Sequence, residues 1–122
     1  MRIVLIGALG AVGALTRFEL SRAIHRRTEH GGVPTMVVNL AGAILFGGLV
    51  GVDARAPFEP DLFAALSVGF LGGFTTFSTW MVDAVFLADE GREGRRRGAL
   101  NLAFTLIGGI ASYTLVRTLV SP

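Results

Sequence analysis

The chain has 122 residues, of which 52% are hydrophobic and only 16% charged, with a formal net charge of +2 at pH 7. With a mean hydropathy of +0.62, this composition excludes a disordered chain and disfavours a soluble domain. The length predicts one domain over residues 1–122, and the lack of cysteine excludes disulfides and thiolate metal sites. The two histidines, His25 and His30, lie in a polar stretch and are predicted to be loop residues rather than metal ligands.

Four apolar segments are long enough to be read as membrane-spanning helices. Three uncharged runs, at 31–52, 62–82 and 98–116, approach or reach the roughly 20 residues that cross a bilayer. The run 3–16 is shorter, but it continues past Arg17 to about residue 23. We therefore predict an all-α membrane protein with four transmembrane helices at about residues 3–23, 32–52, 62–88 and 98–118.

The first segment has an alternative interpretation as the apolar region of a signal peptide, with Arg2 as its charged flank. We disfavour it because no convincing small-residue cleavage site follows.

The breaks between the segments, "HRRTEHGG", "DARAPFEP" and "DEGREGRRRG", combine charge with glycine or proline and are predicted loops. All eleven basic residues are arginines, so the high isoelectric point favours charges at the membrane interface over nucleic-acid binding. Seven arginines flank the first and third loops and three lie at the opposite end. This bias predicts cytoplasmic basic loops and both termini outside.

Glycine recurs inside the predicted spans, at every third residue from Gly7 to Gly13 and as the pairs Gly47/Gly51 and Gly69/Gly73. Small residues allow close backbone approach between helices in lipid. The pattern predicts packing within one subunit or across a dimer face. Four helices of so little bulk can hardly enclose a pore alone, which favours an oligomer.

Two polar residues lie at membrane depth near the first loop. Asn39 lies early in the second span, and Arg17 lies late in the first, each about 10 Å from the shared loop at 1.5 Å per residue. Polar groups at such depth are candidates for function. They could face one vestibule; alternatively, Arg17 snorkels to the interface or pairs with Glu19, and Asn39 makes an interhelical hydrogen bond.

The third span holds the most informative stretch, "GGFTTFSTW". Gly72 and Gly73 lie close to the bilayer midplane, and Thr75 and Thr76 follow directly, a combination that weakens a helix. We predict that the third helix is broken here. Carbonyl groups freed by a break must be covered by protein or a cavity, and they suit a bound cation.

Beyond this point, aromatic residues recur every three positions at Phe74, Phe77 and Trp80, with hydroxyls beside them at Ser78 and Thr79. An aromatic stripe of this spacing is usually packing. The adjacent glycines, the hydroxyls and Asn39 favour a functional surface in so small a protein.

In these residues the sequence resembles the Fluc (CrcB-type) fluoride channel family. The resemblance rests on "GGFTTFSTW" in the third span, "VNLAG" in the second and "GALGAVGALTRF" in the first, and it covers nearly the whole chain. It implies a fluoride-selective channel in a bacterial cell membrane that exports cytoplasmic fluoride passively and gives fluoride resistance. It also implies an antiparallel dimer with two narrow pores.

The resemblance also implies roles in the pore. Asn39 would donate a hydrogen bond to fluoride, and the rings of Phe77 and Trp80 would present their edges to the ion. Ser78 and Thr79 would match a track of hydroxyls along the pore.

Further roles concern the centre and the mouth of the channel. Backbone carbonyls of Gly72 and Thr75 would help to hold a central structural sodium ion shared by two subunits. Arg17 would match a vestibule arginine, and Asp83 an acidic residue that follows the aromatic pair.

The sequence departs from the family pattern at Trp80, where the second pore phenylalanine is expected. The indole adds bulk and an N–H donor, which predicts an altered pore wall. A self-paired protein that inserts both ways needs little arginine bias. The bias therefore raises the possibility that the antiparallel partner is a paralogous chain rather than a second copy.

Two other functions stay open at this stage. A small proton-coupled multidrug or cation exporter also has four spans, but it needs a membrane-embedded carboxylate. The only acidic candidates, Glu19 and Asp83, lie near span ends. A non-transporting assembly subunit would use its polar residues for packing alone. No nucleophile–base pair occurs, so we predict that the chain is not an enzyme.

Overall fold

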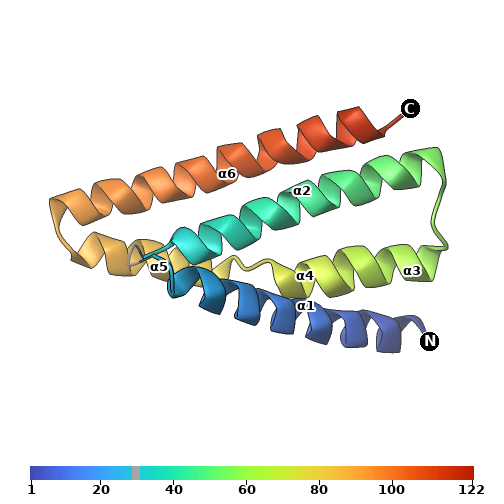
Figure 1. Ribbon diagram of the computed structural model, residues 1–122, viewed down its shortest axis with the longest axis horizontal. Coiled ribbons are helices and arrows are strands. Elements are labelled where there is room, and N and C mark those ends of the chain that lie inside the picture. The colour runs from blue at the N-terminus through green and yellow to red at the C-terminus, as the bar shows by residue number, and fades with distance from the viewer. Residues whose placement is uncertain (29–30) are drawn as a thin grey trace.

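The computed structural model describes residues 1–28 and 31–122, and every regular element in those ranges is helical. Four helical spans are long and apolar enough to cross a membrane: Arg2–His25, Val33–Arg55, Pro60–Asp89 and Arg92–Val120. They confirm the prediction of an all-helical chain with four membrane-length helices. Both termini lie at the same end of the molecule (Figure 1).

The first, second and fourth spans are single helices, α1 (Arg2–His25), α2 (Val33–Arg55) and α6 (Arg92–Val120). The third span consists of several pieces. They are α3 (Pro60–Ala64), the π-helix η1 (Ala65–Leu71), α4 (Gly72–Phe74) and α5 (Ser78–Asp89).

Glycine, proline and an acidic cap mark several of these boundaries. Gly32, with φ +82°, lies in the left-handed region directly before α2, and Pro34 follows in the first turn. The Glu59 carboxylate accepts a hydrogen bond from the backbone N–H of Leu62 at 3.0 Å and caps α3. Gly91, with φ +91°, forms the turn between α5 and α6.

Part of each of the three predicted loops is helical. Residues 53–55 are the end of α2, the arginine-rich residues 92–97 belong to the first turns of α6, and His25 is the last residue of α1. Arginine and glutamate are good helix formers, and Glu93 lies 3.7 Å from both Arg96 and Arg97 at helical spacing. Only Gly91 and its neighbours interrupt the helices there. His30 lies outside the described residues.

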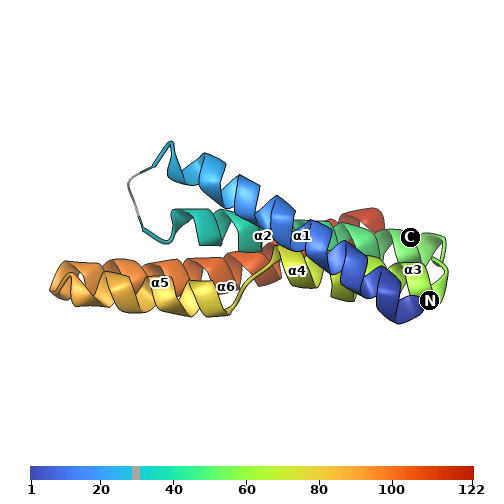
Figure 2. The same ribbon diagram turned by 90° about the horizontal axis from the view of Figure 1, so that it is seen from below.

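Close glycine contacts join α1 to the first part of the third span, which α1 crosses (Figure 2). A Cβ atom at Gly13 would lie 2.1 Å from the carbonyl oxygen of Phe70, and one at Gly73 would lie 2.2 Å from that of Gly10. Neither position has room for a side chain. These contacts support the prediction that small residues bring the helix backbones together.

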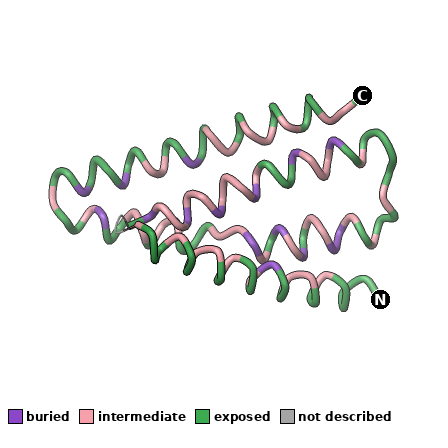
Figure 3. Tube along the Cα trace, viewed as in Figure 1, coloured by how far each residue is buried: buried purple, intermediate pink, exposed green. Residues whose placement is uncertain are grey.

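The outer faces of the helices are apolar and exposed. In α1 and in α6, only 6% of the most apolar 18-residue stretch is buried. The buried residues lie on the inner faces of the helices (Figure 3). Large side chains such as Ile3, Leu15, Phe104 and Leu119 are more than half exposed. A surface of this kind suits lipid or a second protein chain rather than water.

Candidate functional site

The third span changes from helix to extended backbone at Thr75. α4 ends at Phe74, α5 begins at Ser78, and Thr75 has φ −86° and ψ 163°. Gly72 and Gly73, which the sequence analysis took as the weak point, are still helical. The span as a whole is bent by 19°, so its two parts keep similar directions.

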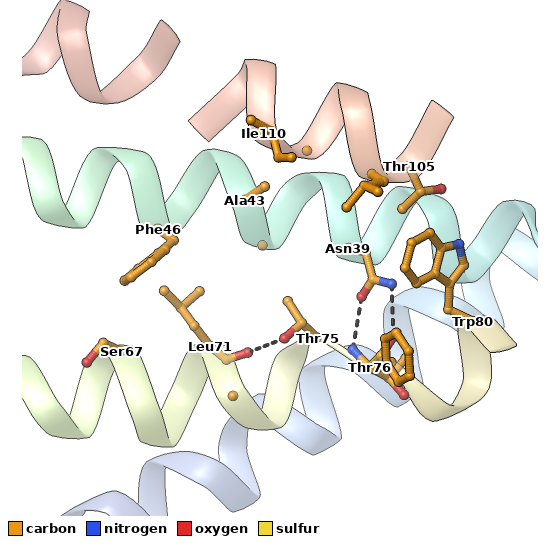
Figure 4. A pocket seen from close by; sticks show the side chains of 15 residues that line it. Asn39, Ala43, Phe46, Ser67, Leu71, Thr75, Thr76, Trp80, Thr105 and Ile110 are labelled. Atoms are coloured by element: carbon orange, nitrogen blue, oxygen red, sulfur yellow. Dashed lines mark hydrogen bonds between the residues drawn. The ribbon is translucent and has the colours of Figure 1, made fainter. Parts of the chain in front are cut away.

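Asn39 of α2 pairs with the backbone at this point. Its Nδ2 donates to the carbonyl oxygen of Thr76 at 2.9 Å, and its Oδ1 accepts from the N–H of Thr76 at 2.9 Å (Figure 4). One side-chain amide thus replaces two backbone partners that a continuous helix would supply. The interhelical hydrogen bond considered for Asn39 is present. Among the described residues, Asn39 Nδ2 makes one hydrogen bond, which uses one of its two hydrogens.

Arg17 of α1 reaches the same region. Its Nε donates to the carbonyl oxygen of Gly73 at 3.1 Å. Glu19, considered as a partner for Arg17, instead lies 3.7 Å from Arg22. Arg17 and Asn39 therefore bond, from two different helices, to backbone groups just before and within the non-helical segment 75–77.

The backbone carbonyls of Gly72 and Thr75 have lost their usual helical donors. The N–H of Thr76, the usual helical partner of the Gly72 carbonyl, is bonded to Asn39. The N–H of Thr79, the usual partner of the Thr75 carbonyl, donates to the Thr76 hydroxyl at 3.3 Å. Among the described residues, no hydrogen bond ends on the carbonyl oxygen of Gly72 or of Thr75.

A cavity of about 460 Å³ lies between α2, α6 and the two parts of the third span (Figure 4). Its wall is mainly apolar and includes Gly42, Ala43, Phe46, Leu71 and Ile110. Besides Phe46, the polar and aromatic groups on it are those of Asn39, Ser67, Thr75, Thr76, Phe77, Trp80 and Thr105. Five of the predicted site residues line this cavity: Asn39, Gly72, Thr75, Phe77 and Trp80.

Ser78 and Thr79 lie beside the cavity rather than on its wall. Both side chains are exposed, and their hydroxyls lie 3.4 Å and 3.1 Å from the Thr76 hydroxyl. Thr76 also caps the start of α5 through the N–H of Thr79. These three hydroxyls form one cluster at the start of α5.

The two aromatic residues meet edge to face. The ring centroids of Phe77 and Trp80 are 5.9 Å apart with an interplanar angle of 77°. Phe77 is 70% exposed, whereas Trp80 is partly buried and its Nε1 donates to Oδ1 of Asn101 in α6 at 3.2 Å. The indole N–H that sets this chain apart from the expected pattern thus has a partner.

Asp83, one turn further along α5, accepts a hydrogen bond at 2.5 Å from the hydroxyl of Thr35, which is buried in α2. A carboxylate and a hydroxyl thus tie α5 to α2 near the arginine-rich end of the molecule. Asp83 does not line the cavity.

Sequence reasoning missed Thr105, Asn101 and the capping role of Thr76. Thr105 lies on the cavity wall, is 5% exposed, and its hydroxyl has no hydrogen-bond partner among the described residues. In Figure 4 this hydroxyl lies on the Trp80 side of the cavity. The available signal was the spacing of Asn101 and Thr105 by one helical turn in an otherwise apolar span.

Comparisons with known proteins match the chain to one family. Residues 4–116 match the model of the CrcB-like protein, Camphor Resistance (CrcB), family. A fluoride-specific ion channel FluC from Nitratidesulfovibrio vulgaris is 38% identical over 111 residues, covering 88% of this chain and 82% of that protein. Fluoride-specific ion channel FluC 1 from Symbiobacterium thermophilum is 41% identical, with 85% and 81% covered. FluC 2 from Natronomonas pharaonis is 37% identical, with 90% and 86% covered.

Proposed function

The chain belongs to the CrcB-like protein family, and from this premise we propose that it is a fluoride-selective channel that lets fluoride leave the cytoplasm passively. The observation that carries this proposal is the cavity beside Thr75–Phe77, where the Asn39 amide and the rings of Phe77 and Trp80 share a mainly apolar wall. Passive transport needs no covalent step, so the protein is a transporter and not an enzyme.

Fluoride is small and strongly hydrated, and it enters a narrow apolar pore only if other groups replace its water. The Nδ2 hydrogen of Asn39 that does not bond to Thr76 is such a donor on the cavity wall. The edges of the Phe77 and Trp80 rings carry the positive part of the aromatic quadrupole and add weak stabilisation. A site made of weak contacts lets the ion enter and also leave.

We assign the remaining polar groups to the path outside this cavity. The hydroxyl cluster of Thr76, Ser78 and Thr79 continues the donors along the start of α5. Arg17 would raise the anion concentration at the mouth of the path. Its Nε–H donates to the carbonyl of Gly73, and the other guanidinium N–H groups would face the anion. Asp83 would orient Thr35 beside the path.

A second subunit would complete the site, and we propose an antiparallel dimer formed with another copy or with a paralogous chain. Gly72 is exposed, and no described residue donates to its carbonyl. A bare carbonyl at this depth costs several kcal/mol in lipid, about the free energy of an unmade hydrogen bond. Covering it with a partner removes that cost and would also cover Phe77.

The same carbonyls fit a structural sodium ion. Hard cations prefer oxygen ligands, and the carbonyl oxygens of Gly72 and Thr75 have no N–H donor among the described residues. An antiparallel pair would supply both carbonyls twice. The ion would neutralise their partial charges and hold the two subunits together.

The arginine distribution supports a bacterial plasma-membrane protein with both basic loops in the cytoplasm and both termini outside. The described turn after α1 and the start of α6 carry most of the arginines, at the end of the molecule opposite the termini (Figure 1). Surrounding lipid would cover the apolar outer faces. We infer no contact with nucleic acid.

The exporter alternative is not favoured. It needs a carboxylate in the membrane interior that is free to exchange protons with cations. Glu19 is exposed beside Arg22, and Asp83 is engaged by Thr35.

Efflux from liposomes tests the proposal. The purified protein, reconstituted alone, should release fluoride while retaining chloride, and Phe77→Ile should slow fluoride release by about tenfold, the effect of roughly 1.4 kcal/mol on a barrier. Equal release of the two halides, or Asn39→Ala and Phe77→Ile proteins as fast as the wild type, would contradict a channel through this cavity. Activity of the chain alone would favour a homodimer over a paralogous partner.

A further inference from the structure

We propose that Asn101 is a positioning residue that holds the indole N–H of Trp80 away from the ion and so keeps a strong donor out of the cavity. This inference rests on the proposed fluoride channel and concerns how one wall of its cavity is set. Asn101 lies on α6 and belongs to neither the predicted site nor the cavity wall.

The hydrogen bonds of Asn101 use both functions of its amide. Oδ1 accepts from Nε1 of Trp80 at 3.2 Å, and Nδ2 donates to the carbonyl oxygen of Gly32 at 3.3 Å. Gly32 lies in the left-handed region, and a Cβ there would lie 3.2 Å from Nδ2 of Asn101. The bond to Gly32 fixes the amide against the start of α2. Its oxygen is thereby directed toward Trp80 of α5.

The orientation of the indole follows from this contact. Trp80 lines the cavity and meets Phe77 edge to face, so its ring position is part of the wall. Figure 4 shows the indole nitrogen on the side of the ring turned away from Asn39, so the carbon part of the ring faces the cavity. With Nε1 bound to Asn101, the cavity side of Trp80 offers ring carbon and hydrogen, as a phenylalanine would.

The chemical reason is the difference between an N–H and a ring edge. An indole N–H is a full donor, and a hydrogen bond to an anion is about twice as strong as a neutral one. On a mainly apolar wall, such a bond added to that from Asn39 would hold fluoride rather than pass it on. The hydrogen bond from Nε1 to the neutral amide of Asn101 prevents this tight binding. It also pairs a partly buried donor that would otherwise lack a partner.

A double-mutant cycle on fluoride efflux tests the inference. Asn101→Leu, which is similar in size and has no polar atoms, should slow fluoride release by about fivefold, the equivalent of one net hydrogen bond. The same change in a Trp80→Phe background should have no effect, because no N–H remains to be released. Asn101→Gln, which keeps both amide functions, should recover part of the rate.

Fluorescence supplies a second measurement that does not depend on transport. Trp80 is the only tryptophan in the chain, so the emission of the purified protein reports this ring alone. Loss of the hydrogen bond in Asn101→Leu should shift its emission to shorter wavelength, and Asn101→Gln should shift it back. An unchanged emission in Asn101→Leu would overturn the proposal.

The results also separate the alternatives. If Asn101→Leu slows transport or prevents assembly equally in the wild-type and Trp80→Phe backgrounds, Asn101 acts through Gly32 alone and the proposal fails. If the wild-type protein releases no fluoride, the proposed function fails, while the emission still reports whether Asn101 holds Trp80.

Discussion

The two parts of the third span are held in different ways. Residues 60–74 pack against α1 through backbone contacts at glycines, where a Cβ at Gly13 or Gly73 would lie within 2.2 Å of a carbonyl oxygen. Residues 78–89 pack against α6, where Trp80 donates a hydrogen bond to Asn101, and Asp83 accepts one from Thr35 of α2. The first part is therefore fixed by shape and the second by directional polar bonds.

The non-helical residues 75–77 lie where the third span stops packing against α1 and begins to pack against α6. On one side of Thr75–Phe77 the span follows α1, and on the other it follows α6. Asn39 and Arg17 bond to backbone groups that this change releases. The polar groups of the site therefore lie at the junction, residues 75–77, between the part that packs on α1 and the part that packs on α6. At this junction side chains replace the missing helical hydrogen bonds.

The largest effect is expected from a substitution that disrupts the close packing of α1 against residues 60–74. Gly13→Val should destabilise the protein by about 3 kcal/mol or prevent its assembly, because the new side chain meets the Phe70 backbone. Thermal unfolding and gel filtration in detergent measure this. Gly7→Val on the same helix is the matched control, since a Cβ there has nothing within 4 Å. Equal losses in the two variants would show that close packing at Gly13 is not the cause.

The next largest effect on stability is expected at the junction, residues 75–77, where Asn39 bonds to the backbone of Thr76. Asn39→Ala leaves the N–H and the carbonyl of Thr76 without partners and should lower stability by about 2 kcal/mol. Asn39→Asp keeps an acceptor for the N–H but loses the donor, so the midpoint of thermal unfolding should move the same way. A wild-type melting temperature for Asn39→Ala would mean that this amide does not hold the junction.

Two threonines on α2 and α6, the helices beside residues 78–89, form a matched pair: Thr35 and Thr105. Thr35→Val removes the bond to Asp83 and should cost about 1 kcal/mol. Thr105→Val removes a buried hydroxyl that has no partner among the described residues, so stability should be kept. Comparable destabilisation by both changes would argue against an unpaired Thr105 hydroxyl.

The smallest effect is expected at the exposed end of the hydroxyl cluster. Ser78→Ala should change stability by less than about 0.5 kcal/mol, because its hydroxyl is exposed and 3.4 Å from that of Thr76. Thr76→Val, which also removes the cap on the Thr79 N–H, should cost about 1 kcal/mol. Reversal of this order in thermal unfolding would place the cap on Ser78 instead.

Much of this arrangement follows from the sequence alone. Apolar runs of membrane length determine four helices, because the backbone in lipid must satisfy its own hydrogen bonds. The glycine pairs indicated close helix contacts, and the motif at Gly72–Trp80 marked the region where the third span leaves the helical state. Local composition is sufficient for these features because each depends on residues close together in the chain.

Only the tertiary structure decided which groups meet. The pairing of Asn39 with Thr76, of Trp80 with Asn101, and of Asp83 with Thr35 joins residues 21 to 48 positions apart. It also placed Thr105, and not Ser78 or Thr79, on the cavity wall. The periodicity of one helix fixes which residues share a face, but the rotation of that face toward its neighbours is set by how all the helices pack.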